Sequence, residues 1–104
     1  MTIKPARLLC VGREINLLRI RCEILTELGY EAQAISLIES EDILRRDTFD
    51  LVILSASLSE QEKGRIFEVI GGRMPTLQLS TMLLPTDLLR EVENRLAQWR
   101  GVQR

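Results

Sequence analysis

The stretch TFDLVILSAS, Thr48–Ser57, contains the segment that decides the fold of this chain of 104 residues. The pattern predicts a strand over Asp50–Leu54, and its unbroken run of apolar side chains requires burial on both faces. Such a strand is typical of the centre of a parallel sheet. It ends at Ser55, a small hydroxyl residue, and the carboxyl end of a parallel strand is where many α/β proteins place their functional groups.

Three further segments are predicted to be strands of the same sheet. The first is short and continuously apolar, the second alternates weakly and is expected at an edge of the sheet, and the last is led by a proline. These three strands are predicted over Ala6–Gly12, Tyr30–Ser36 and Met74–Ser80.

The segments between the first three strands have the periodicity and capping residues of helices. The first predicted helix ends at Gly29, and the second spans Leu37–Arg46 and is opened by Ser36 or Ser40. The apolar face of the first helix is predicted to contain Ile15, Leu18, Cys22 and Leu25, widened by Leu17, Ile24 and Leu28.

Two later segments carry signals for the start of a helix. Ser59 and Glu62 form a capping box, and Gly71 and Gly72 are expected to stop the helix that follows. The last helix is predicted over Thr86–Arg100, with Thr86 as its cap. The buried sides of these helices are predicted to contain Ile66, Phe67, Val69 and Ile70 in the former, and Leu89, Val92, Leu96 and Trp99 in the latter.

This alternation of strands and helices predicts an α/β domain with a parallel sheet and helices on both faces. Right-handed crossovers restrict its topology further. Neither repeats nor a linker interrupt the pattern, so we expect a single domain over residues 1–104.

The composition argues against several classes of function. A net charge of −1 is unlike that of a general nucleic-acid or acidic-membrane binder. The chain has no histidine, which argues against a zinc site and excludes catalysis by an imidazole. Cys10 and Cys22 lie in apolar patterns, and we interpret them as small buried thiols in a reducing cytosol. No apolar run approaches the ~20 residues of a membrane span, and no leader is visible, so we expect a cytoplasmic protein.

The order and spacing of these elements resemble the receiver domain of two-component response regulators. The resemblance is carried by RLLCVGREINLLRIRCEILTELGYEA (Arg7–Ala32), FDLVILSASLS (Phe49–Ser59) and PTLQLST (Pro75–Thr81), and again by LPTDLLREVENRL (Leu84–Leu96). It implies a flavodoxin-like fold, whose strand order in the family is 2-1-3-4-5, and a bacterial signalling protein.

The resemblance also implies where a phosphorylation site would lie. In receiver domains an acidic pair holds magnesium, an aspartate accepts the phosphoryl group, and a Thr or Ser and a lysine contact its oxygens. By position, the acidic pair falls on Gly12 and Arg13, the acceptor on Ser55, the Thr or Ser on Ser80, and the lysine on Leu84. Only Ser80 keeps the residue type of the family. Because magnesium prefers carboxylates and a serine nucleophile needs a base, we predict a pseudo-receiver without metal, cofactor or enzymatic activity, acting through protein contacts.

An alternative hypothesis keeps a ligand at this end of the sheet. An atypical receiver would bind phosphate or another anion at Ser55, Ser80 and Arg13, with space left by Gly12. The competing interpretation is that these serines, with Ser57, satisfy backbone groups in loops. An enzyme of another class has little support, since no phosphate-binding glycine loop follows a strand.

Two acidic residues near these strands are not substitutes for the lost acids. We expect Glu14 to be the ion-pair partner of Arg13, because the two are adjacent. Asp50 begins the third strand, so it is expected at the opposite end of the sheet from Ser55.

The second departure from the family is a deletion. Receiver domains place a helix and a strand where this chain has only Thr81–Leu84, whereas a parallel crossover needs about a dozen residues. We therefore predict four strands in the order 2-1-3-4, with the last helix beside the first. The edge of the fourth strand is then open, and we expect a second copy of the chain to cover it by edge pairing or helix exchange. The alternative is that the segment folds back onto its own core. The predicted dimer or partner surface contains Thr76, Gln78, Met82, Leu83, Leu84 and Trp99.

Overall fold

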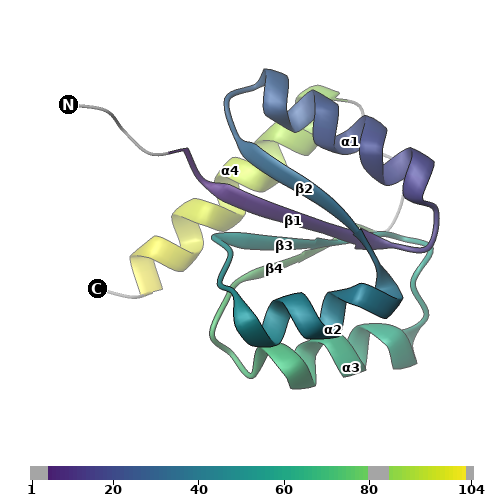
Figure 1. Ribbon diagram of the computed structural model, residues 1–104. Helices are drawn as coiled ribbons and strands as arrows, with labels where there is room; N and C mark the ends of the chain where they lie inside the picture. The colour runs from purple at the N-terminus through teal and green to yellow at the C-terminus, as the bar shows by residue number, and fades with distance from the viewer. Residues whose placement is uncertain (1–4, 80–84, 103–104) are drawn as a thin grey trace.

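The computed structural model describes residues 5–79 and 85–102, in which strands and helices alternate in the predicted order (Figure 1). Ser80, Met82, Leu83 and Leu84, which the sequence assigned to the candidate site or the dimer surface, lie outside the described residues. The elements are β1 (Arg7–Gly12), α1 (Ile15–Glu27), β2 (Glu31–Ser36), α2 (Leu37–Arg46), β3 (Leu51–Leu54), α3 (Glu60–Ile70), β4 (Thr76–Gln78) and α4 (Pro85–Val102).

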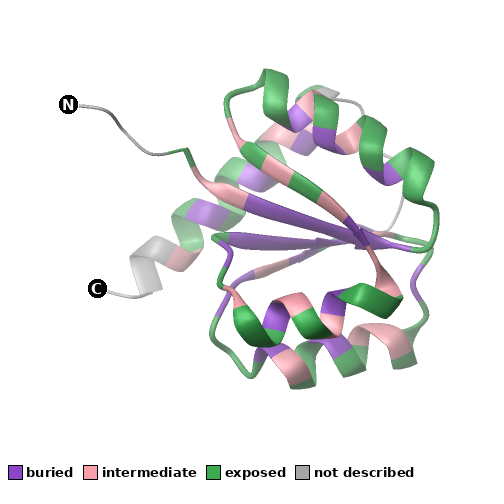
Figure 2. Ribbon diagram, viewed as in Figure 1, coloured by how far each residue is buried: buried purple, intermediate pink, exposed green. Residues whose placement is uncertain are grey.

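The four strands form one parallel sheet in the predicted order, β2-β1-β3-β4. β1 and β3 are the inner strands, and Leu8–Val11 pairs with Leu51–Leu54. Every residue of β3 is buried, as is β1 from Leu8 onward (Figure 2). The apolar run Leu51–Leu54 is therefore explained as predicted, because helices cover both faces of the sheet at this strand.

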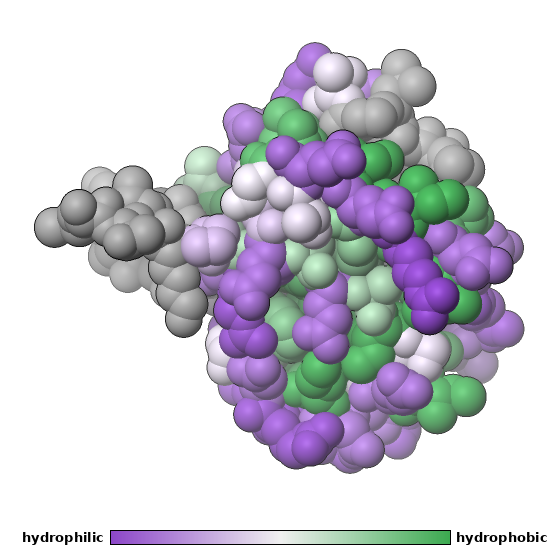
Figure 3. All heavy atoms as spheres, turned by 45° about the horizontal axis from the view of Figure 1, so that its top comes forward, coloured by the Kyte–Doolittle hydropathy of each residue, from purple (hydrophilic) through white to green (hydrophobic). Residues whose placement is uncertain are grey.

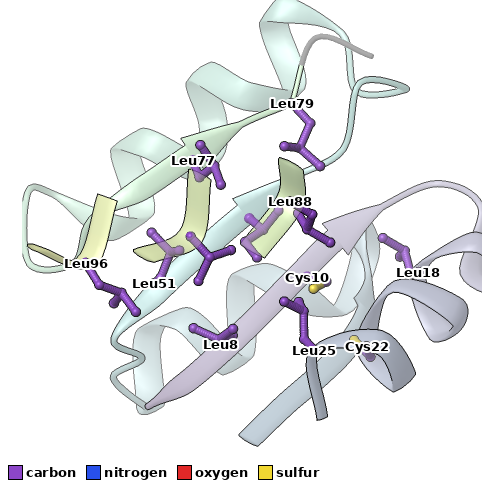
Figure 4. Close-up of a cluster of buried hydrophobic side chains, with 12 residues drawn as sticks. Leu8, Cys10, Leu18, Cys22, Leu25, Leu51, Leu77, Leu79, Leu88 and Leu96 are labelled. Carbon is purple, nitrogen blue, oxygen red and sulfur yellow. The ribbon is translucent and has the colours of Figure 1, made fainter. Parts of the chain in front are cut away.

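Helices cover the two faces in pairs. α1 and α4 lie on one side of the sheet, and α2 and α3 lie on the other, so the last helix sits on the same face as the first, as predicted (Figure 1). Because side chains alternate along each strand, the inner strands divide their residues between the two cores. Leu8, Cys10, Leu51 and Ile53 join the α1/α4 core (Figure 4), and Leu9, Val11, Val52 and Leu54 join the α2/α3 core.

The buried stripe of α1 is narrower than its apolar pattern predicts. Leu18, Cys22 and Leu25 are buried, whereas Leu17 and Leu28, which were expected to widen the stripe, are 39% and 43% exposed. The prediction was wrong for these two residues because one sheet face covers only one side of the helix, and both lie to the side of the buried stripe. It was also wrong for Ile15, the first residue of the helix, which is 36% exposed.

The structure tests the residues that were predicted to cap α2 and α3. Ser36, not Ser40, occupies the cap position of α2. The capping box of α3 is confirmed, since the Ser59 hydroxyl accepts from Glu62 N–H and the Glu62 carboxylate accepts from Ser59 N–H. Gly71 ends α3 with a φ of 58°, a left-handed conformation that glycine adopts at low cost. Within α3, Ile66 and Ile70 are buried as predicted, but Phe67 is exposed and Val69 half-buried.

The start of α4 was predicted one residue late. The helix begins at Pro85, so Thr86 is its second residue rather than its cap. Proline is well suited to a first helical position because its missing N–H would have no helical partner there. The buried residues of α4 are Leu88, Val92 and Leu96, and the predicted Leu89 and Trp99 are half-buried at the sides of this stripe.

The strands are shorter at their ends than their apolar patterns predict. β4 is the clearest case, because only Thr76–Gln78 of the predicted Met74–Ser80 is a strand among the described residues. β2 begins at Glu31 rather than Tyr30, and β3 begins at Leu51 rather than Asp50. Pro75 precedes β4 and has no N–H to donate, although its carbonyl accepts from Val52 N–H of β3 at 3.0 Å.

Charged residues join the strands at the amino-terminal end of the sheet. The Arg7 guanidinium donates to both carboxylate oxygens of Asp47, at 3.1 and 2.8 Å, and lies 4.8 Å from the centre of the Phe49 ring. The hydrogen bonds from Arg7 lower the pKa of Asp47 to about 2. Asp50 accepts from Arg7 N–H at 2.7 Å, which confirms its predicted place far from Ser55.

The described part of the chain, residues 5–79 and 85–102, contains no helix that is both long and apolar enough to cross a membrane.

We predict that truncating an inner-strand residue unfolds the domain far more readily than the same truncation on the surface. Ile53→Ala, at a fully buried position of the α1/α4 core, should lower the free energy of unfolding by about 2–5 kcal/mol. Ile38→Ala makes the same change at a side chain that is 90% exposed, and should stay within about 0.5 kcal/mol of the parent. Urea unfolding of both variants measures the difference, and equal losses would contradict the assignment of the core.

Candidate functional site at the carboxyl ends of the strands

The fold brings Gly12 and Ser55 together at the carboxyl ends of β1 and β3. Val11 and Leu54 are paired in the sheet, and Ser55 N–H donates to the Val11 carbonyl at 2.9 Å. Gly12 is the last residue of β1, and Arg13 follows it directly. Three of the sequence-predicted site residues thus lie at one end of the sheet, as expected for a phosphorylation-site equivalent.

Gly12 is required by close packing rather than by a turn. A Cβ atom at this position would lie 2.8 Å from Ser55 Cβ and 3.1 Å from Leu18 Cδ2, and the first distance is closer than real Cβ contacts. The expectation that Gly12 leaves space for a ligand is therefore wrong on this side of the residue. The space that a side chain would occupy is already filled by Ser55.

The Ser55 hydroxyl serves its own loop. Ser55 is half-buried, and its Oγ accepts from Ser57 N–H at 3.4 Å and from the Ser57 hydroxyl at 3.2 Å. This is the loop role that the sequence left open for these two serines.

Arg13 is held by Glu62 across the end of the sheet. Its Nε and Nη2 donate to the two carboxylate oxygens of Glu62 at 3.1 and 2.5 Å, a two-point contact. The prediction that Glu14 is the partner of Arg13 was wrong, because Glu62 binds the guanidinium, whereas Glu14 lies at the cap position of α1 and its side chain makes no capping hydrogen bond. Sequence reasoning found Glu62 as a capping residue but missed its second role, because the contact joins residues that lie 49 positions apart in the chain.

The Glu62 carboxylate is doubly engaged. Its Oε1 accepts from Ser59 N–H at 2.7 Å, and that bond together with the contact from Arg13 lowers the pKa of Glu62. The carboxylate thus remains charged near neutral pH and connects the β1–α1 loop to the first turn of α3.

The cavity beside these residues does not fit the magnesium ion that the resemblance implies. It has a volume of about 350 Å³ and is lined by Gly12, Arg13, Ser36, Leu37, Ile38 and Glu62. Magnesium is bound through carboxylates with water, and the one carboxylate in this lining faces a guanidinium. In residues 5–79 and 85–102, no group of three or more Cys, Asp or Glu side chains is arranged to hold a metal ion.

The described residues of the predicted dimer surface lie along β4 and α4. Thr76 and Trp99 line one cavity of about 320 Å³, together with Met74, Pro75, Arg95 and Gln98. Gln78 is exposed, at the other end of β4. Met82, Leu83 and Leu84 fall outside the described residues, so their place on this surface remains a prediction.

Comparisons with known proteins support the fold. No family model matches the chain, and no curated protein has a significantly similar sequence. Among solved structures, a response regulator receiver domain protein (CheY-like) from Methanospirillum hungatei JF-1 is similar, with 16% sequence identity and a TM-score of 0.67. The match covers 94% of this chain and 98% of that chain. The chain therefore has the CheY-like, flavodoxin-like fold, here with four parallel strands in the order 2-1-3-4.

We predict that a side chain at position 12 is not tolerated while Ser55 keeps its own. Gly12→Ala should lower the free energy of unfolding by about 1–3 kcal/mol, because the new methyl group overlaps Ser55 Cβ. Adding Ser55→Gly removes that overlap, so the double variant should lose less than the sum of the single losses.

Gly64→Ala is the matched control for this prediction. Gly64 lies inside α3, and a Cβ there meets nothing within 4 Å. Because alanine favours a helix over glycine, this variant should gain up to about 1 kcal/mol. Strict additivity of the Gly12 and Ser55 losses in urea unfolding would contradict the close packing.

Proposed function

We propose that this chain is a pseudo-receiver, a receiver-like module that signals through protein contacts and does not depend on phosphorylation. The observation that carries the proposal is the two-point contact between Arg13 and Glu62. Arg13, a cation paired with Glu62, stands at a position where receiver domains have an acidic residue that binds magnesium. The receiver-like fold supports a response-regulator-like signalling role for the module.

The chemistry at Ser55 supports the same proposal. Phosphoryl transfer to a receiver relies on a metal ion and a carboxylate nucleophile, whereas serine needs a neighbouring base. The chain has no histidine, and the Ser55 hydroxyl receives hydrogen bonds from Ser57 instead of facing a base. The substitutions at positions 12, 13 and 55 thus act together, because each removes a partner that the others would need.

The alternative of an anion-binding receiver gains no support from the described residues. Arg13 is the one cation that lines the cavity, and its guanidinium is already neutralised by Glu62. An anion entering there would have to displace that carboxylate or be repelled by it.

We predict that acetyl phosphate with magnesium leaves the mass of the protein unchanged. The comparison is an ordinary receiver domain with an acceptor aspartate, treated in parallel, which should gain one phosphoryl group. Intact-mass spectrometry measures both products. A magnesium-dependent gain on this chain that is absent from Ser55→Ala would overturn the proposal.

We further propose that the protein partner is a second copy of the chain, bound through the outer edge of β4. Pro75 carbonyl accepts from β3, and Leu79 N–H donates to the Leu54 carbonyl of β3 at 3.0 Å. Because backbone groups alternate in direction along a strand, those of Thr76 and Gln78 point away from β3. Among the described residues no strand pairs with this edge, since β4 ends the sheet order.

A symmetric pair of such edges would satisfy these groups. Edge strands with unpaired N–H and C=O groups readily template another strand, and a two-fold axis lets each β4 pair with the other. The half-buried Trp99 and the adjacent Thr76 lie in the cavity near the start of β4, where a second copy would add apolar contact.

We predict that Gln78→Pro makes the protein monomeric. Proline removes the outward N–H of this edge position, and it leaves the bonds to β3 in place because those come from the neighbouring residues. Gln78→Ala is the control, since it shortens the side chain but keeps the N–H, and it should remain dimeric. Light scattering over a dilution series measures the mass, and a parent chain that is monomeric at every concentration would refute the dimer.

A further inference from the structure

The two cysteines of the chain lie in the same core, one on each side of the β1–α1 interface. Cys10 is on the face of β1 toward α1, and Cys22 is on the face of α1 toward the sheet. Both are free thiols and both are buried, with exposures of 0% and 8%. Figure 4 shows both sulfur atoms in the layer between the strand and the helix.

The two thiols interact directly. A hydrogen bond between them raises the pKa of Cys10, and burial raises it further. The same bond lowers the pKa of Cys22, against the opposing effect of burial. Cys22 is also the more exposed of the two and lines a groove, so it is the sulfur that an oxidant reaches first.

A cation next to the pair favours the thiolate as well. The charge of Arg21 lowers the pKa of Cys22, and its Nη1 is buried without a hydrogen-bond partner in the part of the chain that the structure describes. A cation near a cysteine favours the thiolate, which is the reactive form of the side chain.

A groove leads from solvent to Cys22. It has a volume of about 530 Å³ and runs between α1 and β2, where Figure 3 shows apolar surface bordered by hydrophilic side chains. Ala34 forms part of its lining and is paired in the sheet with Cys10. The small alanine side chains on β2 leave open the path that a larger residue would fill. The groove is lined by Arg19, Cys22, Glu23, Thr26, Glu27, Ala32 and Ala34.

We propose that Cys10 and Cys22 form a peroxide-reactive thiol pair that closes into a disulfide within the chain. The Cys22 thiolate attacks one oxygen of a hydroperoxide, the O–O bond breaks, and the product is a sulfenic acid on Cys22. Cys10 then attacks that sulfur, the S–O bond breaks, and the oxygen leaves as water with the proton of Cys10. Two thiols and one hydrogen peroxide thus yield one disulfide and two waters.

The bond would connect α1 covalently to β1. The loop between these two elements contains Arg13. Oxidation would therefore restrain α1 relative to β1, the strand that ends at Gly12 of the candidate site. Formation of the disulfide uses neither Ser55 nor a phosphoryl group, so its test is independent of the test of the pseudo-receiver proposal.

The test is oxidation of the reduced 104-residue chain with one equivalent of hydrogen peroxide, followed by alkylation under denaturing conditions. The expected product is a single chain lighter by two hydrogen atoms that takes up no maleimide, and that takes up two after reduction. Tryptic digestion should yield the peptides Leu8–Arg13 and Cys22–Arg45 joined by the bond, since cleavage after arginine places one cysteine in each.

Variants assign the roles of the two sulfurs. Cys22→Ser should abolish the joined peptide, and Cys10→Ala should stop the reaction at a Cys22 sulfenic acid that dimedone traps. Separate oxygen additions to each sulfur, or disulfides formed only between chains, would overturn the proposal.

A second pair of variants tests access while leaving both thiols in place. Ala34→Leu fills the groove and should slow the peroxide reaction several-fold, measured as loss of free thiol over time. Ala97→Leu makes the same change at an exposed position of α4 and should react at the parent rate. An Ala34→Leu variant that reacts as fast as the parent would contradict the proposed path.

Discussion

The pairing of β1 with β3 at the centre of the sheet is the constraint on which the rest of the structure depends. Both strands are buried on both faces, so their apolar side chains must be covered from two sides at once. Burial of this kind is the main favourable contribution to folding, and it requires α1 and α4 on one face and α2 and α3 on the other. The positions of Gly12 and Ser55 follow, because each stands at the end of one of these two strands.

At that end of the sheet, close packing and an ion pair hold the residues in place. Gly12 admits Ser55 at a distance that any larger residue would prevent, and Arg13 binds a carboxylate that also caps α3. The contact of Gly12 with Ser55 connects β1 to β3, and the contact of Arg13 with Glu62 connects the β1–α1 loop to α3. Gly12, Arg13 and Glu62 thus have structural roles at this end of the sheet.

Two parts of the molecule remain available for contact or reaction. The outer edge of β4 presents backbone groups that the sheet does not use, and the groove beside β2 leads to a thiol that interacts with a second thiol. Neither surface includes Gly12, Arg13 or Ser55.

The sequence by itself was enough to predict the order of elements and the capping box of Ser59, because periodicity and short-range signals encode these features. The order of the four strands and the side on which the last helix packs were predicted from the resemblance to receiver domains, together with the short segment Thr81–Leu84. The same resemblance identified Gly12, Arg13 and Ser55 as neighbours at the ends of two strands. The partner of Arg13, the contact that makes Gly12 necessary, and the exposure of Leu17 and Phe67 were decided only by the tertiary structure. Each of these three features depends on distances between segments that are far apart in the chain. An amino-acid pattern specifies which side of a helix or strand is apolar, but it does not specify how much of that side the neighbouring sheet or helix covers.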